Sequence, residues 1–253
     1  MYSVLFPVNE LKIGGAEQQL LELVRGIDKT RFHPIVAPLY PNGALTPEFK
    51  AIPGAEVVDL RRRGKYDPSP LWRIALLLKR RQIDIIQPFL SPATFFGLLP
   101  ALAVSTPVIV ATERCGVRRV RGRGYHLYRS AEDHLSRFAD VIIPNSKAGE
   151  EMLRERKLPD WKIRVIYNGI SDERLIVDPD QVVQIRSRFN DSEHPQVVGI
   201  LASLTPAKGH DTLIRSIAAL RDRFSNIRLA IVGDGASRES LESLTAELGI
   251  GDH

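Results

Sequence analysis

Cysteine is nearly absent from this sequence, and long uncharged apolar runs are absent from it altogether. The 253 residues include one cysteine, Cys115, which cannot form an intramolecular disulfide and is typical of a reducing compartment. No stretch approaches the roughly 20 apolar residues of a membrane-spanning helix, and the N-terminus does not have the form of a signal peptide. We therefore predict a cytoplasmic protein in which Cys115 is an ordinary loop or core residue.

The sequence also lacks clusters of His, Cys and Asp at metal-ligand spacing. Asp178-Pro179-Asp180 has the spacing of a metal–nucleotide site, but it precedes a predicted short helix, where aspartate is a common N-terminal cap. We expect capping there and no metal. Zinc-finger spacing, an RNA-binding signature and an isolated basic helix are missing too, so we predict that nucleic acid is not a partner.

Positive charge is in excess and is clustered. The net charge is +5, and one cluster is Arg61-Arg62-Arg63-Gly64-Lys65. The other comprises five arginines interleaved with Tyr125 and Tyr128: Arg118, Arg119, Arg121, Arg123 and Arg129. Clustered cations favour an anionic partner such as lipid head groups or a phosphorylated substrate, although a solvated surface is the simpler explanation of any one run. We predict that the second cluster contacts a lipid-linked or glycan acceptor at a membrane surface.

Apolar strands and amphipathic helices alternate along the chain. Strands are expected after the first residue and at 33–39, 55–60, 83–88, 107–112, 140–144, 163–167, 197–201 and 228–232. Helices are expected between them, notably at 71–81, 92–104, 126–138, 147–156 and 238–248. Strands that are apolar throughout and separated by helices predict an α/β fold with doubly wound parallel sheets.

The strand–helix series pauses near residue 170 and restarts near residue 197. This pattern predicts a Rossmann-like domain over residues 1–170, a linker over 171–195 and a second Rossmann-like domain over 196–253. The second series holds two strands and two helices, too few to cover both faces of a parallel sheet. We therefore expect an incomplete second domain.

Two loops suit a phosphate group. Gly14 and Gly15 lie between the first strand and a helix, where paired glycines let the backbone approach a ligand closely. Lys208 and Gly209 stand at the start of a helix, whose free N–H groups and positive dipole end favour a diphosphate. Each loop taken alone is equally consistent with an ordinary strand–loop–helix connection.

Four segments agree with one family in their order and approximate spacing. They are Gly14-Gly15-Ala16-Glu17, Tyr167-Asn168-Gly169-Ile170, Pro206-Ala207-Lys208-Gly209-His210 and Ile231-Val232-Gly233-Asp234-Gly235. The chain resembles the family 4 retaining glycosyltransferases, in which two Rossmann-like domains face each other across a cleft (the GT-B arrangement). The resemblance implies transfer of a sugar from a UDP- or GDP-linked donor to an acceptor hydroxyl, without a covalent cofactor, in envelope polysaccharide or glycolipid synthesis. It places Gly14 and Gly15 near the donor diphosphate and Lys208 on its phosphates.

The chain departs from the family's pattern in three places. Ser203 stands where the family usually has a phosphate-binding Arg. Glu113 and Arg114 stand where it usually has a His; Glu113 could bind a sugar or acceptor hydroxyl and Arg114 a phosphate, or both are ordinary loop residues. The family's Glu-x7-Glu signature is not recognised, since the pairs Glu48/Glu56 and Glu239/Glu247 lie in the wrong surroundings. The alternative function is therefore a non-catalytic binding or assembly module.

Overall fold

A computed structural model describes residues 1–114, 123–189 and 196–251, with only the backbone described at 123–128, 173 and 174. The chain divides into two compact units, Met1–Ser171 and Asp172–His253. We describe each unit by itself.

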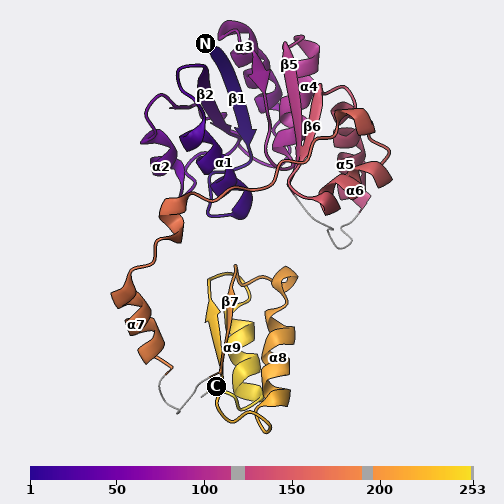
Figure 1. Ribbon diagram of the computed structural model, residues 1–253. Helices are drawn as coiled ribbons and strands as arrows, with labels where there is room; N and C mark the ends of the chain where they lie inside the picture. The colour runs from indigo at the N-terminus through magenta and orange to yellow at the C-terminus, as the bar shows by residue number, and fades with distance from the viewer. Residues whose placement is uncertain (115–122, 190–195, 252–253) are drawn as a thin grey trace. The chain divides into compact units, whose positions relative to one another are not determined.

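The first unit is built on a six-stranded parallel sheet (Figure 1). Its strands are β1 (Tyr2–Val8), β2 (Phe32–Pro38), β3 (Glu56–Val57), β4 (Ile85–Ile86), β5 (Val108–Glu113) and β6 (Val141–Pro144). Its helices are α1 (Gly15–Gly26), α2 (Thr46–Lys50), α3 (Ser69–Arg80), α4 (Ala93–Ala103), α5 (Arg123–Ser136) and α6 (Lys147–Glu155), followed by the 3-10 turn η1 (Asp160–Lys162). The strand order β3-β2-β1-β4-β5-β6 is that of a Rossmann fold, with its direction of winding reversed between β1 and β4. The predicted α/β fold is confirmed.

Side chains alternate between two cores because successive residues of a strand point to opposite faces of the sheet. In β1, Val4, Phe6 and Val8 belong to one core, which also holds Leu20 of α1. Leu5 belongs to the other core, whose further members include residues of α3 and α4: Ile74, Leu78, Phe96, Leu98 and Ala101. Both faces of the sheet are therefore covered, which is why β1 is apolar at every position from Val4 to Val8.

The predicted strand at 163–167 is wrong. Ile163 forms a single isolated bridge with Ile142 of β6, and the N–H of Ile166 still donates to the Pro144 carbonyl at 3.1 Å. Beyond that point, Ile166 and Tyr167 are 55% and 63% exposed. Ile163, 4% exposed, is therefore buried at the edge of the sheet, and the segment leaves the core by Ile166.

The second unit contains the 3-10 turn η2 (Asp172–Leu175), α7 (Pro179–Ser187), β7 (Gln196–Leu201), η3 (Pro206–Lys208), α8 (His210–Leu220), β8 (Ile227–Val232) and α9 (Arg238–Glu247). Strands β7 and β8 pair in parallel, and Ile214, Ile217 and Leu244 form part of the core that α8 and α9 make with them. Asp178 caps α7 by accepting from the Asp180 N–H at 2.9 Å, which confirms the predicted capping role. Among the helices of the described ranges, none has the length and apolar character needed to cross a membrane.

The loops that follow β7 and β8 lie in direct backbone contact. Gly233 has φ +151°, and a Cβ at this position would stand 2.0 Å from the Ala202 carbonyl oxygen. The N–H of Leu204 also donates to the Asp234 carbonyl at 2.9 Å. Glycine at position 233 is therefore needed for both its conformation and its lack of a side chain.

We expect Gly233→Ala to destabilise the protein by at least about 2 kcal/mol, because the backbone it would meet cannot move aside cheaply. Gly199→Ala is the matched control, since a Cβ at Gly199 in β7 meets no atom within 4 Å. Urea denaturation of both variants measures the difference. Equal midpoints for the two variants would show that the two loops are not packed as described.

Candidate functional site

A pocket of about 500 Å³ opens in the first unit at the carboxyl ends of its strands. We call it the switch-point pocket; it is lined by Asn9, Lys12, Gly15, Ala16, Glu17, Gln19, Leu90, Ser91, Arg114, Asn145 and Asn168. Asn9, Arg114 and Asn145 each directly follow a strand, namely β1, β5 and β6. The pocket therefore lies where the strand order reverses, the position at which doubly wound sheets bind their ligands.

Arg114 supplies a desolvated cation to this pocket. Its guanidinium stacks over the Phe89 ring at 4.8 Å and donates through Nη1 to Oδ1 of Asn168 at 3.1 Å. Burial lowers the pKa of Arg114 below its ordinary value, and its Nε is buried without a hydrogen-bond partner. No carboxylate of the described residues pairs with it. A half-buried cation in this state favours an anion beside it.

Glu17 supplies a buried carboxylate to the same pocket. The residue is 3% exposed and lies in the first turn of α1. Burial is the main cause of the raised pKa of Glu17, against the lowering effect of its own backbone N–H and of Lys12. A Cβ at Gly14 would stand 2.3 Å from Glu17 Oε2, whereas a Cβ at Gly15 would meet nothing within 4 Å. Gly14 therefore makes room for this carboxylate, and Gly15 borders the open pocket.

Two segments that are 150 residues apart in the sequence are joined at the edge of the pocket. The Gln19 side-chain amide donates to the Gly169 carbonyl at 2.8 Å and accepts from the Gly169 N–H at 2.9 Å. This pair of bonds ties the start of α1 to the segment that carries Asn168. The first unit thus brings the Gly14-Gly15-Ala16-Glu17 and Tyr167-Asn168-Gly169-Ile170 segments together.

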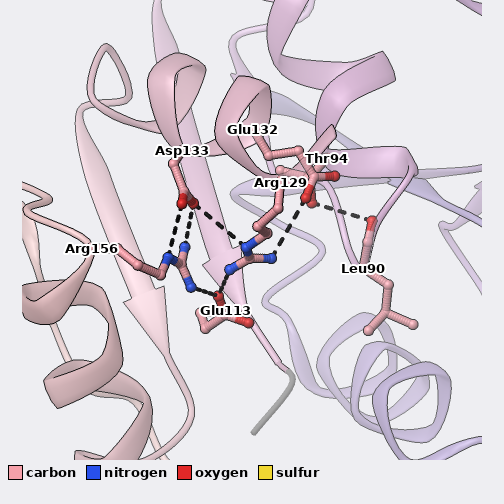
Figure 2. Close-up of polar contacts among 7 residues, drawn as sticks. All are labelled: Leu90, Thr94, Glu113, Arg129, Glu132, Asp133 and Arg156. Atoms are coloured by element: carbon pink, nitrogen blue, oxygen red, sulfur yellow. Dashed lines mark hydrogen bonds and ion pairs between the residues drawn. The ribbon is translucent and has the colours of Figure 1, made fainter. Parts of the chain in front are cut away.

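Glu113 lies outside the pocket lining, in a buried network of charges (Figure 2). Its carboxylate, 5% exposed, accepts from Arg129 and from Arg156 Nη1, the latter at 2.6 Å. Arg156 also binds Asp133 through Nε at 3.0 Å and Nη2 at 2.5 Å. The network links the end of β5 to α5 and to the end of α6. A direct part for Glu113 in binding sugar stays a prediction.

Arg129 does not lie in the exposed basic cluster that the sequence predicted. It is one-quarter exposed and binds Glu113, with Glu132 at 3.5 Å and Asp133 at 3.6 Å. Its neighbours in the predicted cluster cannot be compared with it: Arg118, Arg119 and Arg121 lie outside the described residues, and the Arg123 side chain is not described. Cys115 lies outside the described residues as well. Arg129 therefore serves the buried network rather than a free basic surface.

Glu132 connects this network to the wall of the pocket. The residue is 2% exposed, and burial raises the pKa of Glu132 to about 7, against the lowering effects of a hydrogen bond with Ser91 and of Arg129. Ser91 lines the switch-point pocket, and the neighbouring Leu90 carbonyl accepts from the Thr94 hydroxyl at 3.2 Å (Figure 2). The protonation of a buried acid is thereby linked to one side of the pocket.

The second unit carries a separate cationic position. Lys208 is exposed at the end of η3, and Gly209, with φ +70°, follows it as the N-cap of α8. Gly209 offers no side-chain oxygen, so no side chain caps the N–H groups of the first turn. Ser203 is exposed in the loop after β7. Lys208 beside an uncapped helix start is an arrangement that suits an anion.

Comparison with known proteins identifies the family. The sequence profile of Glycosyltransferase Family 4 matches residues 13–174, and that of Glycosyl transferases group 1 matches residues 183–253. The chain belongs to glycosyltransferase family 4.

Two curated relatives illustrate the range of this glycosyltransferase family. The GDP-mannose-dependent alpha-(1-6)-phosphatidylinositol monomannoside mannosyltransferase of Mycolicibacterium smegmatis is 28% identical over 196 residues, covering 74% of this chain and 48% of the relative. The D-inositol 3-phosphate glycosyltransferase of Stackebrandtia nassauensis is 28% identical over 171 residues, covering 56% of this chain and 38% of the relative. The chain thus spans about half the length of the first of these relatives, and less of the second.

Among solved structures, Anabaena HepE in complex with UDP and glucose superposes with a TM-score of 0.79 at 19% identity, covering 100% of this chain and 68% of HepE. At this identity the likeness concerns the fold. The likeness agrees with the α/β fold described above.

Of the residues that line the pocket, Gly15 and Arg114 were predicted as site residues and the others were not, including the polar Asn9, Lys12, Glu17 and Asn145. A signal for two of them exists, because Asn9 and Asn145 directly follow apolar strands and must lie at the carboxyl edge of a parallel sheet. Glu17 gives no such signal, since its burial depends on how α1 packs. The predicted roles of Gly14, Gly15, Ser203, Lys208 and Gly209 in binding the donor diphosphate stay predictions.

Proposed function

We propose that this chain is part of a retaining glycosyltransferase that moves a sugar from a nucleotide-sugar donor to an acceptor hydroxyl, with no covalent cofactor, in envelope polysaccharide or glycolipid synthesis. One observation supports this function most strongly. A family 4 chain holds a desolvated Arg114, without a carboxylate partner among the described residues, in a pocket at the switch point of its sheet. That pocket suits an anionic substrate group.

The donor chemistry that we propose depends on Lys208. As the glycosidic bond breaks, the leaving nucleoside diphosphate gains negative charge. A fixed lysine and the free N–H groups of α8 stabilise that charge more in the transition state than in the ground state. The mycobacterial relative is named for GDP-mannose and HepE binds UDP, so we propose a UDP- or GDP-linked donor.

A transfer assay tests this function. The chain is incubated with radiolabelled UDP-glucose or GDP-mannose and a bacterial lipid extract, and labelled lipid is counted. We expect labelled product from one of the two donors. Lys208→Ala should give at least about tenfold less product. Arg215→Ala, which removes an exposed cation from α8, should give the wild-type amount. Absence of product with both donors would contradict the proposed function.

The alternative is a non-catalytic binding or assembly module. Ser203 favours it, because this position lacks the second phosphate-binding cation that the family resemblance leads us to expect. Binding of a nucleotide without any transfer in the same assay would support this alternative.

We further propose that the protein meets its acceptor on the cytoplasmic face of a membrane, and that the surface between α3 and α4 contributes to this contact. A groove of about 430 Å³ there is lined by apolar side chains, by Lys79 and by Trp72, which is 70% exposed. Residues 61–81 include eight Lys and Arg residues and one acidic residue, Asp67. Asp67 accepts from the N–H groups of Arg63 and Ser69, at 2.8 and 2.9 Å. An apolar groove that carries an exposed tryptophan and Lys79 suits an anionic bilayer surface.

The two tryptophans of the chain allow a matched test of this contact. With Trp161→Phe, the remaining Trp72 is expected to show a blue-shifted emission with vesicles that contain phosphatidylglycerol, and no shift with pure phosphatidylcholine. With Trp72→Phe, the equally exposed Trp161 is expected to show none. Lys79→Glu should abolish the shift, because it reverses a charge in the groove. An unshifted Trp72 in anionic vesicles would rule out this surface.

A further inference from the structure

Two polar atoms of the switch-point pocket, Asn9 Oδ1 and Arg114 Nε, are buried without a hydrogen bond. The carboxylate of Glu17, which is 3% exposed, lies in the same lining and has a hydrogen bond from its own backbone N–H. Buried polar groups are normally satisfied, so unpartnered groups that gather around one pocket indicate a missing ligand.

The chemistry of these groups constrains the ligand. Glu17 and Asn9 Oδ1 accept hydrogen bonds, and hydroxyl groups of a ligand would donate them. Arg114 favours an anionic group, for which a phosphate is the usual match, and the exposed Lys12 lies in the same lining. A neutral sugar would leave Arg114 unpaired, and a free phosphate would offer Glu17 no hydroxyl donor.

The backbone at Gly14 leaves room for the Glu17 carboxylate. The absence of a side chain at Gly14 leaves space for Oε2, and the first turn of α1 favours a carboxylate near its positive end. The carboxylate therefore lies in the same pocket lining as Asn9 and Arg114, where it can accept from a ligand hydroxyl.

We propose that the switch-point pocket binds a phosphorylated polyol as the acceptor, with Glu17 accepting a hydrogen bond from a ring hydroxyl and Arg114 binding the phosphate. This inference rests on the proposed function and names its acceptor class. Glu17 is then a residue that determines acceptor specificity.

Calorimetry of the 253-residue chain tests the proposal with D-inositol 3-phosphate, glucose 6-phosphate, their unphosphorylated polyols and inorganic phosphate as probes. We expect at least one polyol phosphate to bind about tenfold more tightly than its polyol or phosphate alone. Glu17→Gln, which keeps the size of the side chain, should weaken polyol phosphate about tenfold and leave inorganic phosphate unchanged. Glu22→Gln, on the same helix and outside the pocket lining, should change neither.

Arg114→Gln distinguishes the two sources of a phosphate group. If the phosphate belongs to the acceptor, this variant loses affinity for polyol phosphate and keeps its affinity for UDP and GDP. If Arg114→Gln instead weakens UDP or GDP alone, the cation belongs to the donor and the proposal is overturned. Failure of every polyol phosphate to bind overturns it as well. Loss of nucleotide binding in Lys208→Ala is measured separately and reports on the proposed function.

Discussion

Arg156→Ala is expected to cost about 3 kcal/mol of folding stability, although Arg156 lies outside the lining of the switch-point pocket. Its guanidinium bridges Glu113, at 2.6 Å, and Asp133, at 3.0 and 2.5 Å. Removing it leaves two acidic groups, of which Glu113 is almost fully buried, with Arg129 as their remaining partner within this network. Loss of one partner from a buried ion network is costly because the other charges stay desolvated.

Arg154→Ala is the matched control. Arg154 is two residues away and also binds two acidic residues, Glu150 at 2.9 Å and Asp160 at 2.8 Å, but its side chain is 51% exposed. Exposed pairs contribute little, so we expect a loss of at most about 1 kcal/mol. Urea denaturation with both variants measures the contrast. Similar losses for the two arginines would show that the network around Glu113 is not a buried one.

The second large effect concerns pH. Burial raises the pKa of Glu132 to about 7 from 4.5, with Arg129, Glu113 and Asp133 as its charged neighbours. Between these two values the folded protein binds more protons than the unfolded chain. The contribution of protonated Glu132 to the free energy of unfolding is therefore complete below pH 4.5 and is lost as pH rises through about 7. At roughly 1.4 kcal/mol for each pH unit between the two values, the loss is about 3 kcal/mol.

Glu132→Gln removes this titration. The free energy of unfolding of the variant minus that of the wild type should therefore rise by about 2–3 kcal/mol between pH 5 and pH 8. Glu155→Gln, at an exposed position, should show no such change with pH. Urea denaturation of the three proteins at the two pH values gives the comparison. A stability difference between Glu132→Gln and wild type that is independent of pH would contradict burial of this acid in its charged neighbourhood.

The fold could be predicted from the sequence because its strands are buried on both faces. Each residue of β1 from Val4 to Val8 packs into the sheet or its cores, and such strands read as uninterrupted apolar runs. The segment 163–167 also reads as apolar, but the hydrogen bonds that make a strand depend on a neighbour, and here one bridge forms. Periodicity alone cannot separate these two cases.

The site was less predictable, because the place of several of its side chains depends on how distant segments pack together. Arg114 could be singled out because it follows a strand, whereas Arg129 could be placed only once the fold brought it to Glu113, 16 residues away in the sequence. In the sequence both are simply arginines near a basic run. Glu17 stands in a segment whose glycines attract attention, and only the packing of α1 shows that the carboxylate occupies the space that Gly14 leaves.

The most direct test of the proposed transferase is donor binding, because it needs no knowledge of the acceptor. The chain is titrated by calorimetry with UDP, GDP, UDP-glucose and GDP-mannose, as wild type, Lys208→Ala and Arg215→Ala. We predict saturable binding of one nucleotide class, at least about tenfold weaker in Lys208→Ala and unchanged in Arg215→Ala. Binding of none of these nucleotides, or equal binding by Lys208→Ala, would contradict a donor site at the start of α8.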